Sequence, residues 1–162
     1  RDTVIRRTVR GVIVSFADEP FHRRMQTMGD IAERRFEEFT QTNFVRYGLN
    51  RPPIHMASLP ATIRHTPDYL TSECFIEVQG IGRDQMLKMK LEKMKALGSW
   101  HRMHKLQLFV YDSANDRDAL IPYNQLQKLC RKAEVESFPE GKQYYAIPAA
   151  LVWVDESQGN TN

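Results

Sequence analysis

Apolar side chains recur along this chain at two spacings. Residues 25–41 carry them at the spacing of a helix with one face toward a core: Met28, Ile31, Ala32, Phe36 and Phe39. Residues 83–97 form a second expected helix, which ends at a Gly-Ser pair, and residues 122–133 form a third that starts at Pro122. The other apolar positions lie in shorter runs that suit strands.

Two of these shorter runs flank a polar turn. Residues 61–70 and 72–80 lie on either side of Thr71–Glu73, which is the pattern of a β-hairpin. Residues 3–20 alternate and are rich in β-branched side chains, so they predict a strand or hairpin that ends at the proline in position 20.

Strands and helices therefore alternate, and this order predicts an α/β fold with a central mixed sheet flanked by helices. Residues 105–112 form a mostly apolar strand suited to the middle of that sheet, and residues 143–155 are strand-like. The length of 162 residues fits a single domain. We expect its core at about 28–112, a C-terminal helix and strand extension at 113–155 and a frayed tail at 156–162.

Composition excludes several classes of protein. Apolar residues make up 41% and charged residues 27%, which is typical of soluble globular chains, and no apolar run reaches the ~18 residues of a membrane span. The first residues also lack the apolar stretch of a secretory signal, so we expect an intracellular, cytoplasmic protein without a membrane partner. Cys74 and Cys130 have no ligand set for zinc around them and are expected to be buried thiols.

Charge is distributed unevenly along the chain. The net charge is only +3, but residues 83–105 hold seven Lys and Arg against two acids, a local charge of +5. Such a segment can present a cationic face to phosphates. It can equally be the solvated face of a lysine-rich helix, which is the more common case for charge alone.

The strongest candidate for chemistry is a pair of carboxylates on the predicted hairpin. Glu77 and Gln79 share one face of the second strand, and Asp68 at the mouth of the first strand can approach Glu77. Two such acids repel each other unless a cation lies between them, and their hard oxygen ligands suit Mg²⁺ or Mn²⁺. A divalent ion of this kind supports phosphodiester hydrolysis. The alternative is structural: Asp68 closes a Pro-Asp turn, and Glu77 is an outward strand residue.

The same residues resemble a known family. The sequence TPDYL, then FIEVQG, a basic helix and an apolar strand are similar to the core of the PD-(D/E)XK nuclease superfamily, over roughly residues 28–112. That superfamily includes restriction endonucleases, lambda-type exonucleases and the junction-resolving endonuclease I of short-tailed phages. The resemblance implies a restriction endonuclease-like fold, and it is compatible with a phage-encoded protein.

The resemblance also implies roles for individual residues. Asp68 and Glu77 match the two acids that hold Mg²⁺ or Mn²⁺, with the Val78 carbonyl as a further metal ligand. Glu33 matches an acid in the preceding helix, which binds the metal directly or through water. Glu38 is the reserve for Glu33 on the flank of the same helix, whereas Glu37 points farther from the apolar face and is expected to be solvated.

Gln79 departs from the family pattern, because most members have a lysine at this position. Glutamine cannot act as a cation, but it can orient a water or a phosphate oxygen by hydrogen bonding. Some members recruit a lysine from the following helix, and at 100° per residue Lys90 falls within the apolar arc of Leu87, Leu91 and Met94. We therefore expect Lys90 to replace the motif lysine, the alternative being a side chain that reaches solvent at the helix edge.

Other basic residues are candidates for contact with the nucleic-acid backbone. This set comprises Arg64, His65, Lys88, Lys93 and Lys95. The last three are expected to point outward from the second helix, where each can also be plain surface. Trp100, in the predicted loop after that helix, is expected to cap the core and less so to stack on a base.

These observations predict a Mg²⁺-dependent DNA endonuclease, and the resemblance to phage resolvases makes branched or junction DNA a reasonable substrate. Paired incisions need two active sites, which favours a homodimer. Two alternatives stay open: a catalytically inactive DNA-binding or structural protein on a nuclease fold, with Gln79 as a mark of decay, and an RNA nuclease.

Overall fold

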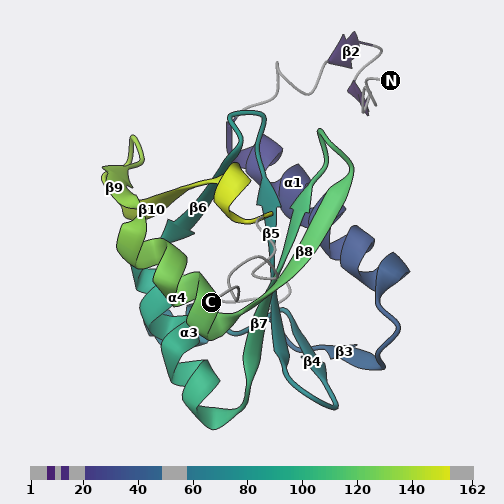
Figure 1. Ribbon diagram of the computed structural model, residues 1–162. Helices are drawn as coiled ribbons and strands as arrows, with labels where there is room; N and C mark the ends of the chain where they lie inside the picture. The colour runs from purple at the N-terminus through teal and green to yellow at the C-terminus, as the bar shows by residue number, and fades with distance from the viewer. Residues whose placement is uncertain (1–6, 10–11, 15–20, 49–57, 154–162) are drawn as a thin grey trace, which may run out of the picture.

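The computed structural model describes residues 7–9, 12–14, 21–48 and 58–153, and for 7–9, 12–14 and 21–27 the backbone only. The fold is α/β, with a mixed five-stranded sheet in the order β3-β4-β5-β7-β8 (Figure 1). Its strands are β3 (Phe44–Arg46), β4 (Tyr69–Thr71), β5 (Phe75–Ile81), β7 (Leu106–Asp112) and β8 (Arg117–Pro122). β5 and β7 are parallel, and the other neighbouring pairs are antiparallel.

The remaining strands form two smaller sheets. A three-stranded antiparallel sheet has the order β6-β10-β9, with β6 at Met86–Lys90, β9 at Glu134–Ser137 and β10 at Gln143–Pro148. Near the N-terminus, β1 (Arg7–Val9) and β2 (Val12–Val14) pair as a hairpin, as the alternation over 3–20 predicts. The rest of that segment, and the tail at 156–162, lie outside the described residues.

Helices cover both faces of the five-stranded sheet. The long helix α1 (Phe21–Phe39) lies on one side, and α3 (Leu91–Met103) and α4 (Tyr123–Lys132) lie on the other with the three-stranded sheet (Figure 1). A short helix, α2 (Ala61–Arg64), lies between β3 and β4, and a 3-10 turn, η3 (Ala149–Leu151), follows β10. Within the described residues, no helix combines the length and the hydropathy needed to cross a bilayer.

The core has two main parts because alternate residues of β5 point to opposite faces. Ile76 and Val78 pack under α1 against Ala32 and Phe36. On the other face a larger cluster joins β7, α3, α4 and the three-stranded sheet, with Leu97 and its neighbours fully buried. Helix α1 approaches β5 so closely that a Cβ on Gly80 would lie 3.2 Å from the Met28 carbonyl oxygen, so a larger residue there would require the helix backbone to shift by a few tenths of an ångström.

Several sequence-based expectations are confirmed. The helices expected at 25–41 and 122–133 correspond to α1 and α4, and the buried strand expected at 105–112 is β7. The hairpin around Thr71–Glu73 is formed by β4 and β5. Both cysteines are buried free thiols, and the Trp100 side chain is buried with its indole N–H donating to the Thr62 carbonyl oxygen.

The helix expected at 83–97 is wrong in its bounds. Residues 86–90 are strand β6, and helix α3 begins at Leu91 and continues through the Gly-Ser pair that we expected to stop it. Leu87 and Met89 of β6 point into the core, and the strand is held by pairing with β10 more than fifty residues later in the chain. The run 61–70 is also only partly a strand, because α2 takes its first residues.

The free edge of β5 is where the fold creates a site. β4 pairs with β5 at Tyr69↔Ile76 and Leu70↔Phe75, so in the part of the chain that the structure describes the second half of β5 has no partner strand on that side. Helices α1 and α3 lie on opposite faces of the sheet (Figure 1), and residues of both helices line one pocket together with residues of β5.

Candidate active site

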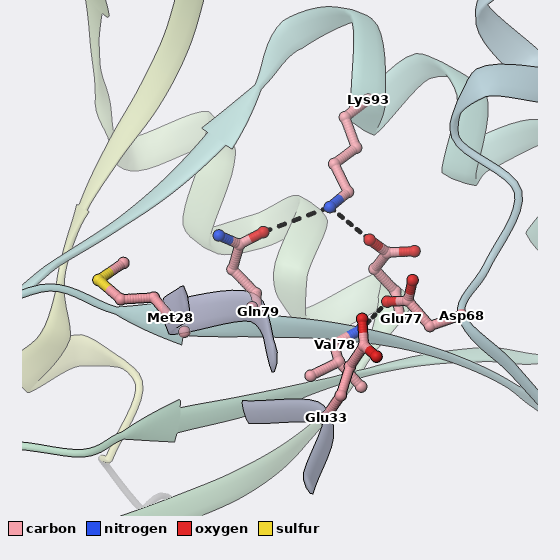
Figure 2. Close-up of a pocket in the computed structure, with 9 residues that line it drawn as sticks. Met28, Glu33, Asp68, Glu77, Val78, Gln79 and Lys93 are labelled. Atoms are coloured by element: carbon pink, nitrogen blue, oxygen red, sulfur yellow. Dashed lines mark hydrogen bonds and ion pairs between the residues drawn. The ribbon is translucent and has the colours of Figure 1, made fainter. Parts of the chain in front are cut away.

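A pocket of about 240 Å³ opens at this free edge of β5. Its wall comes from α1, the residue before β4, the middle of β5 and the first turn of α3. It is lined by Met28, Gly29, Glu33, Asp68, Glu77, Val78, Gln79, Gly80 and Lys93. Three of these residues carry carboxyl groups and one carries an ammonium group, so the pocket holds more acidic than basic groups. Figure 2 shows how their side chains converge.

The Asp68 side chain accepts a hydrogen bond from the backbone of β5 where β4 no longer pairs with that strand. It lies one position beyond the last β4–β5 pair, and its Oδ2 accepts a hydrogen bond from the Val78 amide at 2.8 Å (Figure 2). The Asp68 carbonyl accepts two more, from the amides of Tyr47 and Gly48. Burial raises the pKa of Asp68, and the Lys93 charge and the Val78 amide oppose part of this rise. The carboxyl group is thus fixed in position while its other oxygen remains available to the pocket.

Glu77 is the most deeply buried acid of the pocket, with 3% of the residue exposed. Its Oε1 forms an ion pair with the Lys93 ammonium, and its Oε2 has no hydrogen-bond partner among the described residues. Burial, followed by the charge of Asp68, raises the pKa of Glu77 to about 8. A buried carboxylate oxygen without a donor is costly, so this geometry favours a cation or a proton at Oε2.

The lysine that reaches the acids is Lys93, on the first turn of α3. Its ammonium contacts Glu77 and also donates to Gln79 Oε1 at 3.3 Å (Figure 2). Burial opposes the positive charge, but the carboxylates of Glu77 and Asp68 outweigh it and raise the pKa of Lys93. The side chain is 19% exposed, and the expectation that it points outward is wrong.

Lys90 does not occupy the position expected for it. It is the last residue of β6 and not a member of a helix, and its ammonium lies 5.3 Å from the centre of the Phe138 ring. The helical angle that places Lys90 among Leu87, Leu91 and Met94 has no meaning here, because residues 86–90 form a strand. The lysine that lies beside the acids is Lys93 of α3, and not Lys90.

Glu33 joins the pocket from α1. Burial, followed by the charge of Asp68, raises the pKa of Glu33. Glu38 is exposed on the same helix. Glu37 is not solvated as expected, because its Oε1 accepts a hydrogen bond from the Tyr69 hydroxyl at 2.8 Å and pairs with Arg46.

The other basic candidates lie outside the pocket. Lys88 of β6 pairs with Asp84, which precedes that strand, and Lys95 is exposed on α3. Arg64 and His65 both face Glu92, beside the pocket. Burial, followed by the charge of Lys93, lowers the pKa of His65.

A cation in this pocket would have two carboxylates beside it, those of Asp68 and Glu77. The unpartnered Glu77 Oε2 and the excess of acidic groups both favour a cation. In the described part of the chain, however, no group of three or more His, Cys, Asp and Glu side chains is gathered closely enough to hold a metal. Asp68 and Glu77 would thus need the Val78 carbonyl and water as further ligands, a set that Mg²⁺ accepts readily and zinc does not.

Comparison with known proteins adds little to this geometry. No protein-family model matches the chain, and no curated protein matches it. Among solved structures, the chain is similar to D212, a nuclease from a fusselovirus, with a TM-score of 0.37 and 12% sequence identity over 78% of each chain. A likeness of this size assigns neither a family nor an activity.

Proposed function

We propose that this protein is a metal-dependent nuclease that hydrolyses DNA phosphodiester bonds at the pocket beside β5. One observation carries the proposal: a buried carboxylate, Glu77, has one oxygen on the Lys93 ammonium and the other without a partner among the described residues, with Asp68 alongside. Most buried carboxylate oxygens of structural acids are hydrogen-bonded, so the unpartnered Oε2 favours a cation or a proton at this point, and the proposal takes the cation. The order of these residues along the chain also agrees with the resemblance to PD-(D/E)XK nucleases.

Each residue of the pocket has a role in this proposal. Asp68, Glu77 and the Val78 carbonyl hold Mg²⁺ or Mn²⁺, and Glu33 contributes through a bound water. When bound, the divalent ion lowers the pKa of a water and offsets the negative charge that develops on the phosphate. Lys93 replaces the motif lysine, and Gln79 holds the Lys93 ammonium and orients the attacking water.

The hydrolysis itself needs only water and the phosphodiester. A water oxygen forms the new bond to phosphorus, the bond from phosphorus to the leaving sugar oxygen breaks, and that oxygen takes up a proton. The ammonium of Lys93 offsets charge on the attacked phosphate or supplies this proton, and Glu77 keeps it charged and in place. Branched DNA as substrate and a homodimer as the assembly stay predictions of the resemblance.

The proposal is tested by nicking of supercoiled plasmid in Mg²⁺ and in Mn²⁺, against the same reaction in EDTA. We expect nicking by the wild type, and its loss in Asp68→Asn and Glu77→Gln, which keep the shapes of the side chains. Glu73→Gln is the matched control, because Glu73 is an exposed acid in the turn of the same hairpin. A parallel reaction on single-stranded and duplex RNA separates a DNA nuclease from an RNA nuclease.

Three outcomes would contradict the proposal. Binding of DNA without cleavage in any divalent metal would favour the inactive DNA-binding alternative. Cleavage of RNA but not DNA would change the substrate class. Nicking that survives in Asp68→Asn and Glu77→Gln would place the chemistry elsewhere or trace it to a contaminant.

A further inference from the structure

A second polar cluster lies beside the pocket, around Glu92 in the first turn of α3. Its carboxylate is contacted by side chains from three other parts of the chain: Arg64 of α2 at 3.4 Å, His65 just after α2 at 3.6 Å and Lys142 of the β9–β10 turn at 3.3 Å. One carboxylate therefore contacts two permanently charged cations and a histidine. The cluster keeps an excess of positive charge.

The contacts within this cluster are long and incomplete. All three exceed the ~2.7–2.9 Å of a strong charge-assisted hydrogen bond. Arg64 Nε and His65 Nε2 are buried atoms without a hydrogen-bond partner among the described residues. Glu92 is 34% exposed and Lys142 48% exposed at the side chain, so a ligand from solvent can reach both. Unused donors and excess charge together favour an anion.

The cluster adjoins the pocket through two short connections. Glu92 and Lys93 are consecutive, and His65 precedes Asp68 by three residues. Burial lowers the pKa of His65, and the nearby charge of Lys93 lowers it further. In addition, the first N–H groups of α3 lie here, and the residue before the helix, Lys90, makes no side-chain cap. A chain of phosphates that places one phosphate in the pocket can thus place a neighbour at this cluster.

We propose that Arg64, His65 and Lys142 form a binding site for a DNA backbone phosphate next to the one that is cleaved, with Glu92 as the internal counter-ion that this phosphate displaces. This inference rests on the proposed function for the identity of its ligand. It makes Lys142, which no sequence pattern singled out, a substrate-binding residue. It also assigns Glu92 an opposing role: the acid orders the basic side chains in the free protein but competes with substrate.

The test is direct DNA binding, measured in EDTA so that no cleavage occurs. Fluorescence anisotropy with a labelled 20-base-pair duplex gives the affinity and its dependence on salt. We expect Lys142→Gln to weaken binding about tenfold and to reduce the slope of log K against log salt by about 1, the loss of one phosphate contact. Arg64→Gln should act in the same way. Lys128→Gln, with the same charge change on exposed α4, should change neither.

Glu92→Gln gives the most specific result, because the two roles considered for Glu92 predict changes in DNA affinity of opposite sign. If the Glu92 carboxylate competes with the phosphate, Glu92→Gln should tighten DNA binding about threefold or more. This effect should exceed that of Glu134→Gln, which removes the charge of an exposed acid on β9. If Glu92 is purely structural, its removal would loosen the basic side chains and weaken binding. A cooperative thermal transition in each variant ensures that the comparison concerns folded protein.

These outcomes separate the two proposals. If the wild type nicks plasmid but Lys142→Gln binds DNA with wild-type affinity and salt slope, or Glu92→Gln weakens binding, the phosphate site is overturned and the nuclease stands. If Lys142 and Arg64 carry DNA binding but no divalent metal supports cleavage, the nuclease is overturned and the phosphate site stands. A wild type that does not bind the duplex would overturn the phosphate site.

Discussion

Replacement of Lys93 by methionine should expose the energetic link between the ammonium and the buried acid. Methionine preserves much of the volume of the side chain and removes its charge. Glu77, which is 4% exposed at the side chain, then loses its only described salt-bridge partner. Loss of one partner of a buried ion pair typically costs about 3–5 kcal/mol. Because the Lys93 side chain is 19% exposed and water screens part of the interaction, we expect about 3 kcal/mol.

The size of this loss should depend on pH in a definite direction. The pKa of Glu77 is raised to about 8 in the folded protein, above its ordinary value of 4.5, so the folded state binds the proton more tightly than the unfolded state. Stability from this group is therefore present at low pH and is lost as pH rises toward 8. Without Lys93 the carboxylate is harder still to ionise, so the difference between Lys93→Met and wild type should widen as pH rises.

Urea unfolding in EDTA at pH 6 and at pH 9 measures how much the free energy of unfolding falls in Lys93→Met at each pH. We expect a loss of about 1.5 kcal/mol at pH 6, where Glu77 is protonated, and about 3 kcal/mol at pH 9, because one pH unit above a pKa of about 8 adds about 1.4 kcal/mol. Lys90→Met is the matched control, because its ammonium lies over the Phe138 ring and should contribute about 1 kcal/mol or less at either pH. Equal losses in the two variants, or a Lys93→Met loss that does not grow with pH, would refute the reasoning.

Three further results are expected. Mn²⁺ affinity, measured by calorimetry, should rise about tenfold from pH 6 to pH 7 and level off above pH 8, because Glu77 must release its proton to bind metal; an affinity independent of pH would remove Glu77 from the site. Gly48→Ala should destabilise the protein by about 1–3 kcal/mol in urea unfolding and slow nicking, because the new Cβ would lie 3.1 Å from the Asp68 Cα. Gly29→Ala is the control: its Cβ has open space around it, so this variant should stabilise the protein by about 0.5–1 kcal/mol in the same assay. Tyr69→Phe should cost about 1 kcal/mol in the same assay through the hydrogen bond to Glu37, while the more exposed Tyr47→Phe should change little.

The sequence predicts well those features that depend on local patterns. The apolar face of α1 and the run of apolar residues in β7 are strong local signals, and both elements form where they were expected. The alternation of β5 places Glu77 and Gln79 on one face, and both side chains line the pocket. The turn around Thr71–Glu73 brings Asp68 opposite Glu77 for the same reason, since the register of a hairpin follows from its turn.

Strand β6 could not be predicted in the same way. Its residues, Met86–Lys90, alternate over five positions only and run directly into a helix of lysine, leucine and methionine, which favour helices. What makes it a strand is its pairing with β10, and contacts so distant along the chain leave no local signal. The same holds for Lys142, which reaches Glu92 only because the β9–β10 turn folds back.

The choice of the wrong lysine follows from that one missed strand. With the helix started at Leu91, Lys93 falls at about 200° on the helical wheel, within the arc from about 140° to 300° that holds the buried residues of α3. Those residues are Met94, Ala96, Leu97 and Trp100. A correct helix start would thus have placed Lys93 on the buried face and left Lys90 outside the helix.

The central claim is that Asp68 and Glu77 share one divalent ion. An anomalous difference map from a crystal soaked in Mn²⁺ tests it most directly. We expect a peak within about 2.0–2.3 Å of a carboxylate oxygen of each acid, and no peak in a Glu77→Gln crystal soaked in the same way. A peak at other residues, or a pocket in which Lys93 still holds Glu77 and no ion binds at saturating Mn²⁺, would contradict it.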